Sequence, residues 1–264
     1  MAELTQQPSD QEIMAHHARI KEDLMAKPLI GPLIDFGELE HDYEGNERQV
    51  FSGKIKNIKS QFKGMRSTRR DGNCFYRAAA YRFAQLLADE SCSSVWSKWA
   101  LENVLGSKTL LVESLGYPES IVEDFYDQFV ETIRKKGADL EADFLDEGIS
   151  NNAVCYLKLL VAASLKKNRD LFEAFILDMS PSIESFISTH VEPMGVDADN
   201  PQIAAVCCAL GIKCKIYNLD SSQTDGEQAN VVEMAPLTEI PVGDDAIPCI
   251  CLLYRPGHYD LLTT

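Results

Sequence analysis

The spacing of apolar residues changes near residue 212, and this change limits the folds open to the chain. Before that point apolar residues recur three and four positions apart, as in helices with one buried face. Beyond it, Ile212, Cys214 and Ile216 alternate with polar residues, which indicates a half-buried strand. The runs 249–254 and 258–262 are typical of two further strands. Helices followed by clustered strands predict a single α+β domain with a small sheet packed against helices.

Gly, Pro and Asn residues divide the helical part into segments. Besides a helix that starts at or just after Cys74, the spacing predicts helices at 11–27, around 55–62, and at 93–105, 119–136, 139–146, 150–166, 169–177, 181–190 and 201–210. A short apolar pattern, Leu33, Phe36, Leu39 and Tyr43, lies between the first two. Strands are expected only in the C-terminal part.

Residues 1–10 are polar and predict a flexible tail. Ile13, Ile20 and Leu24 follow at helical spacing, so residues 11–27 are expected to form an amphipathic N-terminal arm, with residues 28–264 as the main domain. Two interpretations of the arm remain open: its apolar face packs on the domain, or it binds a partner.

The chain has 25 Lys and Arg against 41 Asp and Glu, a net charge of −16. This charge repels phosphate, so neither nucleic acid nor an anionic membrane is expected as a partner, whereas a basic protein is favoured. No signal-peptide pattern and no run of eighteen apolar residues occurs, which predicts a protein of the cytoplasm or the nucleus. The stretch 51–70 is basic and the stretch 113–147 is acidic. Two interpretations remain open: the charges lie on solvated helix faces, or they form a surface that steers a charged partner.

Eight cysteines occur without a C-x-x-C pair, so we expect free thiols and neither a zinc site nor a disulfide framework. Cys74 follows the turn Asp71-Gly72-Asn73 and opens a predicted helix. The helix N-terminus would lower the pKa of the Cys74 thiol, and the N–H groups of the turn could bind an oxyanion. The alternative is a small buried apolar residue, which is the usual role of a free cysteine.

A second group of reactive side chains surrounds a Pro-Gly turn that leads His258 into the last strand. Asp260 lies two positions on and shares the face of His258, about 7 Å away along the strand. Its carboxylate could hold one imidazole nitrogen while the other faces a thiol. Tyr259 would point to the opposite face, toward the core. A His-x-Asp pattern alone also occurs on exposed strands, but with Cys74 it fits an activated nucleophile.

Two sequence motifs resemble those of the ovarian-tumour (OTU) cysteine proteases, and specifically the otubains. They are Asp71-Gly72-Asn73-Cys74-Phe75-Tyr76-Arg77 and Leu252-Leu253-Tyr254-Arg255-Pro256-Gly257-His258-Tyr259-Asp260. The resemblance runs from about Ile13 to Leu262. It implies a papain-like α+β fold with a small mixed sheet, and residues 28–264 as an OTU-type catalytic domain. It also implies hydrolysis of isopeptide bonds to ubiquitin without metal or cofactor.

Carried over by position, Cys74 resembles the nucleophile, His258 the general base and Asp260 its orienting carboxylate. Asp71 resembles the residue that shapes the oxyanion loop, to which Gly72 and Asn73 belong. The family uses Asp or Asn in the third position of the triad. The sequence departs from the otubain pattern after Glu192-Pro193-Met194, where Asp199 is followed by Asn200 and not by the usual histidine. The expected linkage preference of otubains is therefore not carried over.

The leading hypothesis is a deubiquitinase whose partners are ubiquitin and polyubiquitin chains. A second hypothesis is a binding protein that restrains ubiquitin-conjugating enzymes through the N-terminal arm, as some otubains do. A third is another Cys-His acyl-transfer enzyme, such as an amide transferase.

Overall fold

Six strands form one mixed sheet in the computed structural model, which describes residues 9–43, 49–222 and 228–264. They are β1 (Ile30–Ile34), β2 (Gly64–Thr68), β3 (Lys213–Asn218), β4 (Asn230–Met234), β5 (Cys249–Arg255) and β6 (His258–Thr263), in the order β1-β2-β6-β5-β3-β4. Strands β3 and β5 run parallel, and the other neighbours are antiparallel. The predicted α+β class with a small mixed sheet is confirmed.

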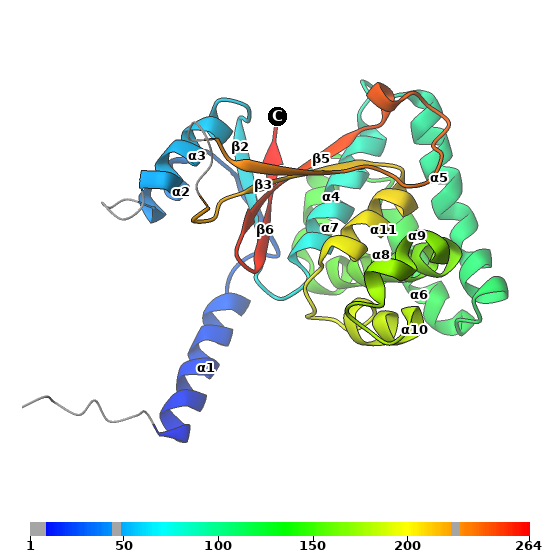
Figure 1. The fold of residues 1–264 in the computed structure, drawn as a ribbon, viewed down its shortest axis with the longest axis horizontal. Helices are drawn as coiled ribbons and strands as arrows, with labels where there is room; N and C mark the ends of the chain where they lie inside the picture. Colours follow the sequence, from blue (N-terminus) through cyan, green and yellow to red (C-terminus); the bar gives the residue numbers. More distant parts are fainter. Residues whose placement is uncertain (1–8, 44–48, 223–227) are drawn as a thin grey trace, which may run out of the picture.

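Alternation along the strands divides the apolar side chains between two cores. Leu252 and Leu261 pack into the larger core, whereas the next residues, Leu253 and Leu262, pack into the smaller one. Successive strand residues point to opposite faces, so both faces of the sheet are covered. In Figure 1 the two sets of helices lie on either side of it.

The larger core lies under the helices that follow Asn73. These are α4 (Cys74–Ala88), α5 (Ser94–Thr109), α6 (Glu119–Thr132), α7 (Gly137–Leu145), α8 (Glu147–Lys167), α9 (Arg169–Ile176), α10 (Ile183–Phe186) and α11 (Asn200–Leu210), with π-helical turns at Leu110–Ser114 and Ile187–Val191. Helix α8 contacts α4, α6, α7 and α11, which makes it the central helix. Of the described helices, α8 alone is long and apolar enough to span a membrane, but 72% of its apolar window is buried in this core.

The smaller core is covered by α2 (Gly37–Asp42) and α3 (Gln49–Lys59). Phe36, Leu39, Ile55 and Ile58 pack there against the sheet. The lysines of the basic stretch 51–70 differ in exposure. Lys54 is buried and donates to the backbone oxygen of Asp220, whereas Lys59 is exposed.

The expectation that only the C-terminal part forms strands is wrong. Residues 30–34 and 64–68 form β1 and β2; β4 (230–234) does lie in the C-terminal part but was not predicted. Strand β1 contains a proline and a bulge at the sheet edge, and β2 is largely polar, so neither has the alternation of a half-buried strand. Both are stabilised by pairing with segments distant in sequence, β2 with β6.

Helix α1 (Asp10–Met25) projects away from the rest of the molecule (Figure 1). Its side chains Ile13 and Met14 are 40% and 72% exposed. Arg69 fixes the C-terminal end of the arm by donating to the backbone oxygen of Lys27 at 2.9 Å. The predicted tail lies mostly outside the described residues, and so does the side chain of Ile20.

Candidate active site

Cys74 is the first residue of α4, as predicted, and its side chain is almost completely buried. The backbone N–H groups of Phe75 and Tyr259 donate toward its sulfur. Tyr259 belongs to β6, so the thiol lies against the strand that carries His258 and Asp260. The fold therefore brings the two predicted groups together although they are far apart in sequence.

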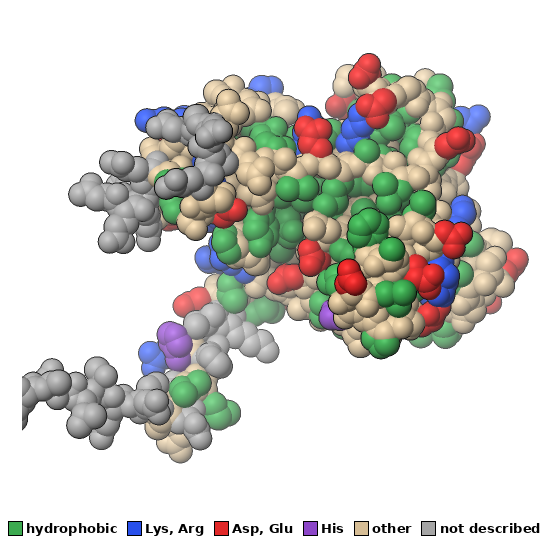
Figure 2. Space-filling model, in the orientation of Figure 1, with side chains coloured by type: hydrophobic (Ala, Val, Ile, Leu, Met, Phe, Trp, Pro, Cys, Tyr) green, Lys and Arg blue, Asp and Glu red, His purple; other side chains and the backbone are tan. Residues whose placement is uncertain are grey.

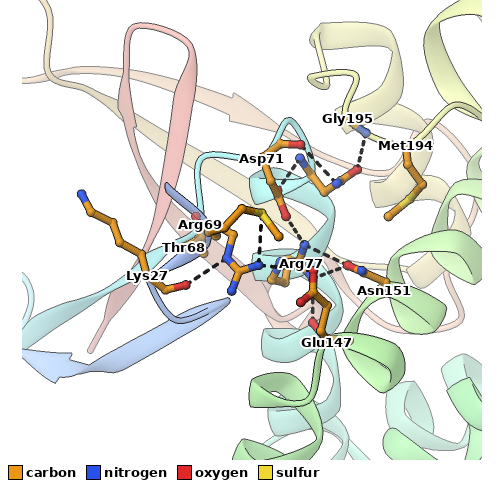
Figure 3. Close-up of polar contacts among 12 residues, drawn as sticks. Lys27, Thr68, Arg69, Asp71, Arg77, Glu147, Asn151, Met194 and Gly195 are labelled. Carbon is orange, nitrogen blue, oxygen red and sulfur yellow. Dashed lines mark hydrogen bonds and ion pairs between the residues drawn. The ribbon is translucent and has the colours of Figure 1, made fainter. Parts of the chain in front are cut away.

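The turn before Cys74 has a fixed shape. Oδ1 of Asp71 accepts the N–H of Asn73 at 2.9 Å, and Gly72 adopts φ +74°, where glycine is favoured. The Asn73 side chain accepts the N–H of Gly195 at 3.0 Å (Figure 3). Because Asp71 already binds the Asn73 N–H, the N–H groups of Gly72 and Cys74 are the ones available to an oxyanion in the described structure.

Arg77 lies one turn after Cys74 and is completely buried. Its guanidinium donates to Oδ2 of Asp71 at 2.5 Å and to Ser150 and Asn151 of α8 at 2.7 and 3.2 Å (Figure 3). The charge of Arg77 thus ties the turn to the central helix. The sequence analysis missed this role, although a charged residue inside an apolar helix face is the signal that could have indicated it.

His258 and Asp260 lie on one face of β6, and both are buried. Nε2 of His258 is 2.8 Å from Oδ1 of Asp260. The same carboxylate accepts the Thr68 N–H at 3.0 Å, and its Oδ2 accepts from Arg255 at 2.6 Å. Burial alone would raise the pKa of Asp260, but His258 and Arg255 hold it below its usual value. Asp260 is thus an ionised orienting group, and Arg255 is a second residue that the sequence analysis missed.

Tyr259 lies on the other face, as expected, but is only half-buried. Its ring packs against Phe75 and Tyr254, with centroids 5.6 and 5.0 Å away. It therefore forms part of a groove wall as well as the edge of the core.

The predicted lowering of the Cys74 pKa is wrong for this conformation. Burial raises the pKa of the thiol to about 11, and the carboxylate of Asp197 adds to this effect. Nδ1 of His258 is buried and has no hydrogen-bond partner among the described residues, so it does not bond to the thiol. The position of Cys74 at a helix N-terminus does not indicate how deeply the thiol is buried. In this structure the effect of burial on the thiol pKa outweighs that of the helix dipole.

Two pockets lie beside the start of strand β6. One, about 360 Å³, is lined by Asp197, Asp199, His190, Gln202, Met179, Tyr254 and Tyr259; we call it the Asp197 groove. The other, about 300 Å³, includes His258, Arg70, Arg255 and the end of the arm at Lys27. The segment after Met194 thus lines a groove beside the thiol, where a substrate groove was expected. Asp199 also caps α11, with Gln202 completing a capping box.

A cysteine at a helix N-terminus, a histidine held by a carboxylate and a shaped N–H turn make up the side-chain set of a cysteine peptidase. A family model described as Peptidase C65 Otubain matches residues 22–264. The chain belongs to the otubain family.

Similar proteins cover nearly the whole chain. The ubiquitin thioesterase OTUB1 of Rattus norvegicus is 32% identical over 259 residues, covering 96% of this chain and 90% of the relative. The ovarian tumor domain-containing deubiquitinating enzyme 1 of Arabidopsis thaliana is 29% identical, covering 97% and 84%. A solved complex of h/ceOTUB1 with ubiquitin aldehyde and UBC13~Ub superimposes with a TM-score of 0.78 at 28% identity, covering 96% of this chain and 97% of the other.

Proposed function

We propose that this protein is a deubiquitinase that hydrolyses the isopeptide bond at the C-terminal glycine of ubiquitin. The observation that carries the proposal is the meeting of Cys74, on α4, with the His258–Asp260 pair of β6 beside a turn with two available N–H groups. Relatives that are named ubiquitin thioesterases and match nearly the whole chain support the choice of ubiquitin as substrate.

The reaction follows from the positions of these groups. His258 takes the proton of the Cys74 thiol through Nδ1, since Nε2 is held by Asp260. The thiolate attacks the glycine carbonyl, and the resulting oxyanion accepts from the N–H groups of Gly72 and Cys74. His258 then protonates the departing lysine amine, which leaves ubiquitin as a thioester. Water, deprotonated by His258, hydrolyses that thioester and restores the thiol.

A small movement must precede this reaction, because the thiol and Nδ1 are not hydrogen-bonded in the free enzyme. The buried Nδ1 of His258 has no hydrogen-bond partner in the described part of the chain, and an unsatisfied buried polar atom costs about 1–3 kcal/mol. Formation of the Cys74–His258 bond removes that cost.

The surface around the Asp197 groove suits ubiquitin, whose tail is basic. Asp197 and Asp199 supply negative charge to the groove. Beside it, α9 and the residues that follow expose Phe175, Leu177 and Met179, which are 67%, 53% and 46% accessible. Large apolar side chains exposed together mark interaction sites. Acidic and apolar contacts to ubiquitin therefore adjoin the thiol.

The N-terminal arm favours a second function, binding of ubiquitin-charged conjugating enzymes. On the face shown in Figure 2, α1 presents hydrophobic and charged side chains away from the body. Its end at Lys27 lines the hollow on the other side of His258. The family match starts at residue 22, so most of α1 lies outside it. Solved complexes of h/ceOTUB1 that contain UBC13~Ub or UBCH5B~Ub motivate this assignment.

The catalytic proposal is tested by incubating the wild type and Cys74→Ser with a ubiquitin C-terminal amide and with a panel of diubiquitins. The wild type should release the amine and cleave at least one linkage, and Cys74→Ser should do neither while its melting temperature stays unchanged. Cleavage of a non-ubiquitin acyl amide in preference to ubiquitin would favour another acyl-transfer reaction.

A further inference from the structure

A buried amine lies behind the oxyanion turn. Lys158 of α8 is only 1% exposed. Its Nζ donates to the backbone oxygens of Pro193 and Val196 at 2.8 and 3.4 Å. The same Nζ lies 4.4 Å from the centre of the Tyr76 ring, two residues after Cys74. Lys158 therefore joins the first turn of α4 to the segment 193–196.

No carboxylate forms an ion pair with this amine among the described residues. Burial lowers the pKa of Lys158 to about 8, because removing the ammonium group from water disfavours its charged form. A buried charge is tolerated where its hydrogen bonds are satisfied, and here backbone oxygens and an aromatic face serve that purpose. The Lys158 amine thus supplies N–H donors to segment 193–196 that an apolar side chain would not supply.

The segment that Lys158 holds is the one that packs on the oxyanion turn. The N–H of Gly195 donates to Oδ1 of Asn73 at 3.0 Å. The backbone oxygen of Gly195 would lie 2.2 Å from a Cβ atom at Gly72, so the two backbones are in close contact. A shift of segment 193–196 would therefore displace the turn whose N–H groups face the substrate carbonyl.

Two tethers to α8 thus fix the turn from two sides. Arg77 reaches Asp71 from Ser150 and Asn151, at the start of the helix. Lys158 acts two turns later through Gly195 and Asn73. Arg77 thus fixes the Asp71 carboxylate, and Lys158 fixes the segment that packs against Gly72.

We propose that Lys158 is a positioning residue for the oxyanion turn, which it holds in the conformation that binds the transition state. This inference rests on the proposed function, because it assigns Lys158 to the same reaction. Loss of one whole oxyanion donor lowers kcat about 10²- to 10³-fold. Displaced donors should cost less, so Lys158→Met should lower kcat about ten- to hundredfold, with KM for a ubiquitin amide nearly unchanged.

Lys54 offers a matched control. It is also fully buried and also donates to a backbone oxygen, that of Asp220 at 3.0 Å, but it lies on α3, on the opposite side of the sheet, and it additionally pairs with the Asp220 carboxylate at 2.8 Å. Lys54→Met also removes a buried amine, together with its ion pair to Asp220, and should lower the melting temperature without lowering kcat. Lys158→Arg keeps N–H donors and charge and should restore most of the activity of Lys158→Met.

The deciding experiment compares the affinities of each folded variant for ubiquitin aldehyde and for free ubiquitin. The aldehyde forms a hemithioacetal with Cys74 whose oxygen occupies the oxyanion turn, whereas free ubiquitin needs only the binding surface. Lys158→Met should weaken aldehyde binding at least about tenfold and leave ubiquitin binding unchanged. If Lys158→Met does not fold, Lys158→Leu, which also lacks N–H donors, should give the same selective loss.

Equal aldehyde affinity in Lys158→Met and the wild type would overturn the inference. So would an equal loss of both affinities, since that indicates a general structural role. If the wild type itself binds ubiquitin but neither reacts with the aldehyde nor hydrolyses the amide, the proposed function fails, and the inference fails with it.

Discussion

Oδ1 of Asp260 lies 2.8 Å from Nε2 of His258, while the buried Nδ1 of the same ring has no hydrogen-bond partner among the residues that the structure describes. The histidine is thus oriented before the thiol is bound. The carboxylate is held in turn by Thr68 and Arg255. The His258–Asp260 pair is therefore already formed in this structure, whereas Nδ1 of His258 does not bond to the Cys74 thiol.

Asp260→Ala should lower kcat by about tenfold or more, because Nε2 of His258 loses the carboxylate that orients the ring. His258→Ala should cost at least as much, since the base itself is lost. Steady-state hydrolysis of a ubiquitin C-terminal amide measures both. Wild-type activity of Asp260→Ala across the pH range would mean that another group orients the histidine.

Arg255→Gln tests the charge that keeps Asp260 ionised. The pKa of Asp260 is depressed in the folded state, so its contribution to stability is present above the ordinary carboxyl pKa and is lost as the pH falls through the folded value. Removal of Arg255 raises the folded pKa. The variant should therefore be less stable at neutral pH and unfold in acid at a higher pH than the wild type.

Acid titrations followed by Trp fluorescence measure this difference. Lys215→Gln is the control, since it removes only the exposed pair with Glu233 and should change little. An acid midpoint for Arg255→Gln equal to that of the wild type would contradict the role given to Arg255.

The raised thiol pKa makes Cys74 slow to react in the free enzyme. Its alkylation by iodoacetamide should accelerate as the pH rises toward about 11. Asp197→Asn removes a negative charge that raises this pKa, so alkylation at pH 8 should become about twofold faster. Mass spectrometry of the Cys74 peptide gives the rate, and Asp178→Asn, at another exposed carboxylate, should leave it unchanged. A slower reaction in Asp197→Asn would contradict the electrostatic account.

Gly72→Ala should damage both the fold and the activity, because the new methyl group would meet the backbone oxygen of Gly195. Gly116 provides the control: its φ is +72° and nothing lies within 4 Å of an added Cβ. Gly116→Ala should lose about 1–2 kcal/mol of stability from backbone strain alone and keep full kcat. If Gly72→Ala matched Gly116→Ala in both stability and kcat, the turn would not be as tightly packed as described.

Removal of residues 1–24 tests the arm while sparing the contact between Lys27 and Arg69. Hydrolysis of the ubiquitin amide should survive, whereas cleavage of diubiquitin and affinity for a ubiquitin-charged conjugating enzyme should fall. The double variant Ile13→Ser and Met14→Ser should reproduce this loss, since both side chains are exposed. A melting temperature lowered by several degrees, with amide hydrolysis also lost, would indicate that the arm is part of the fold.

The helices and the last strands were predictable because their patterns are local. The 3.6-residue period after Cys74 and the apolar run of β5 each carry their own signal. Strands β1 and β2 have no such signal and depend on pairing with distant segments. They are the part of the sheet that sequence periodicity does not reveal.

The site residues also differ in whether local sequence could reveal them. Cys74, His258 and Asp260 were identified from turn chemistry, strand spacing and resemblance. The roles of Arg77, Arg255 and Lys158 depend on contacts between elements, as does the burial that raises the thiol pKa. A lone charge in an apolar helix stretch, as at Lys158, was the available signal for the last of these.

The most direct test of the central claim is the position of the adduct formed with a ubiquitin probe that carries a C-terminal electrophile. All eight cysteines are free, so each could in principle react, including the half-buried Cys92 and Cys155. Peptide mapping should find a single adduct at Cys74, absent in Cys74→Ala and formed far more slowly in His258→Ala. An adduct at another cysteine, together with amide hydrolysis that persists in Cys74→Ala, would contradict the assignment of the nucleophile.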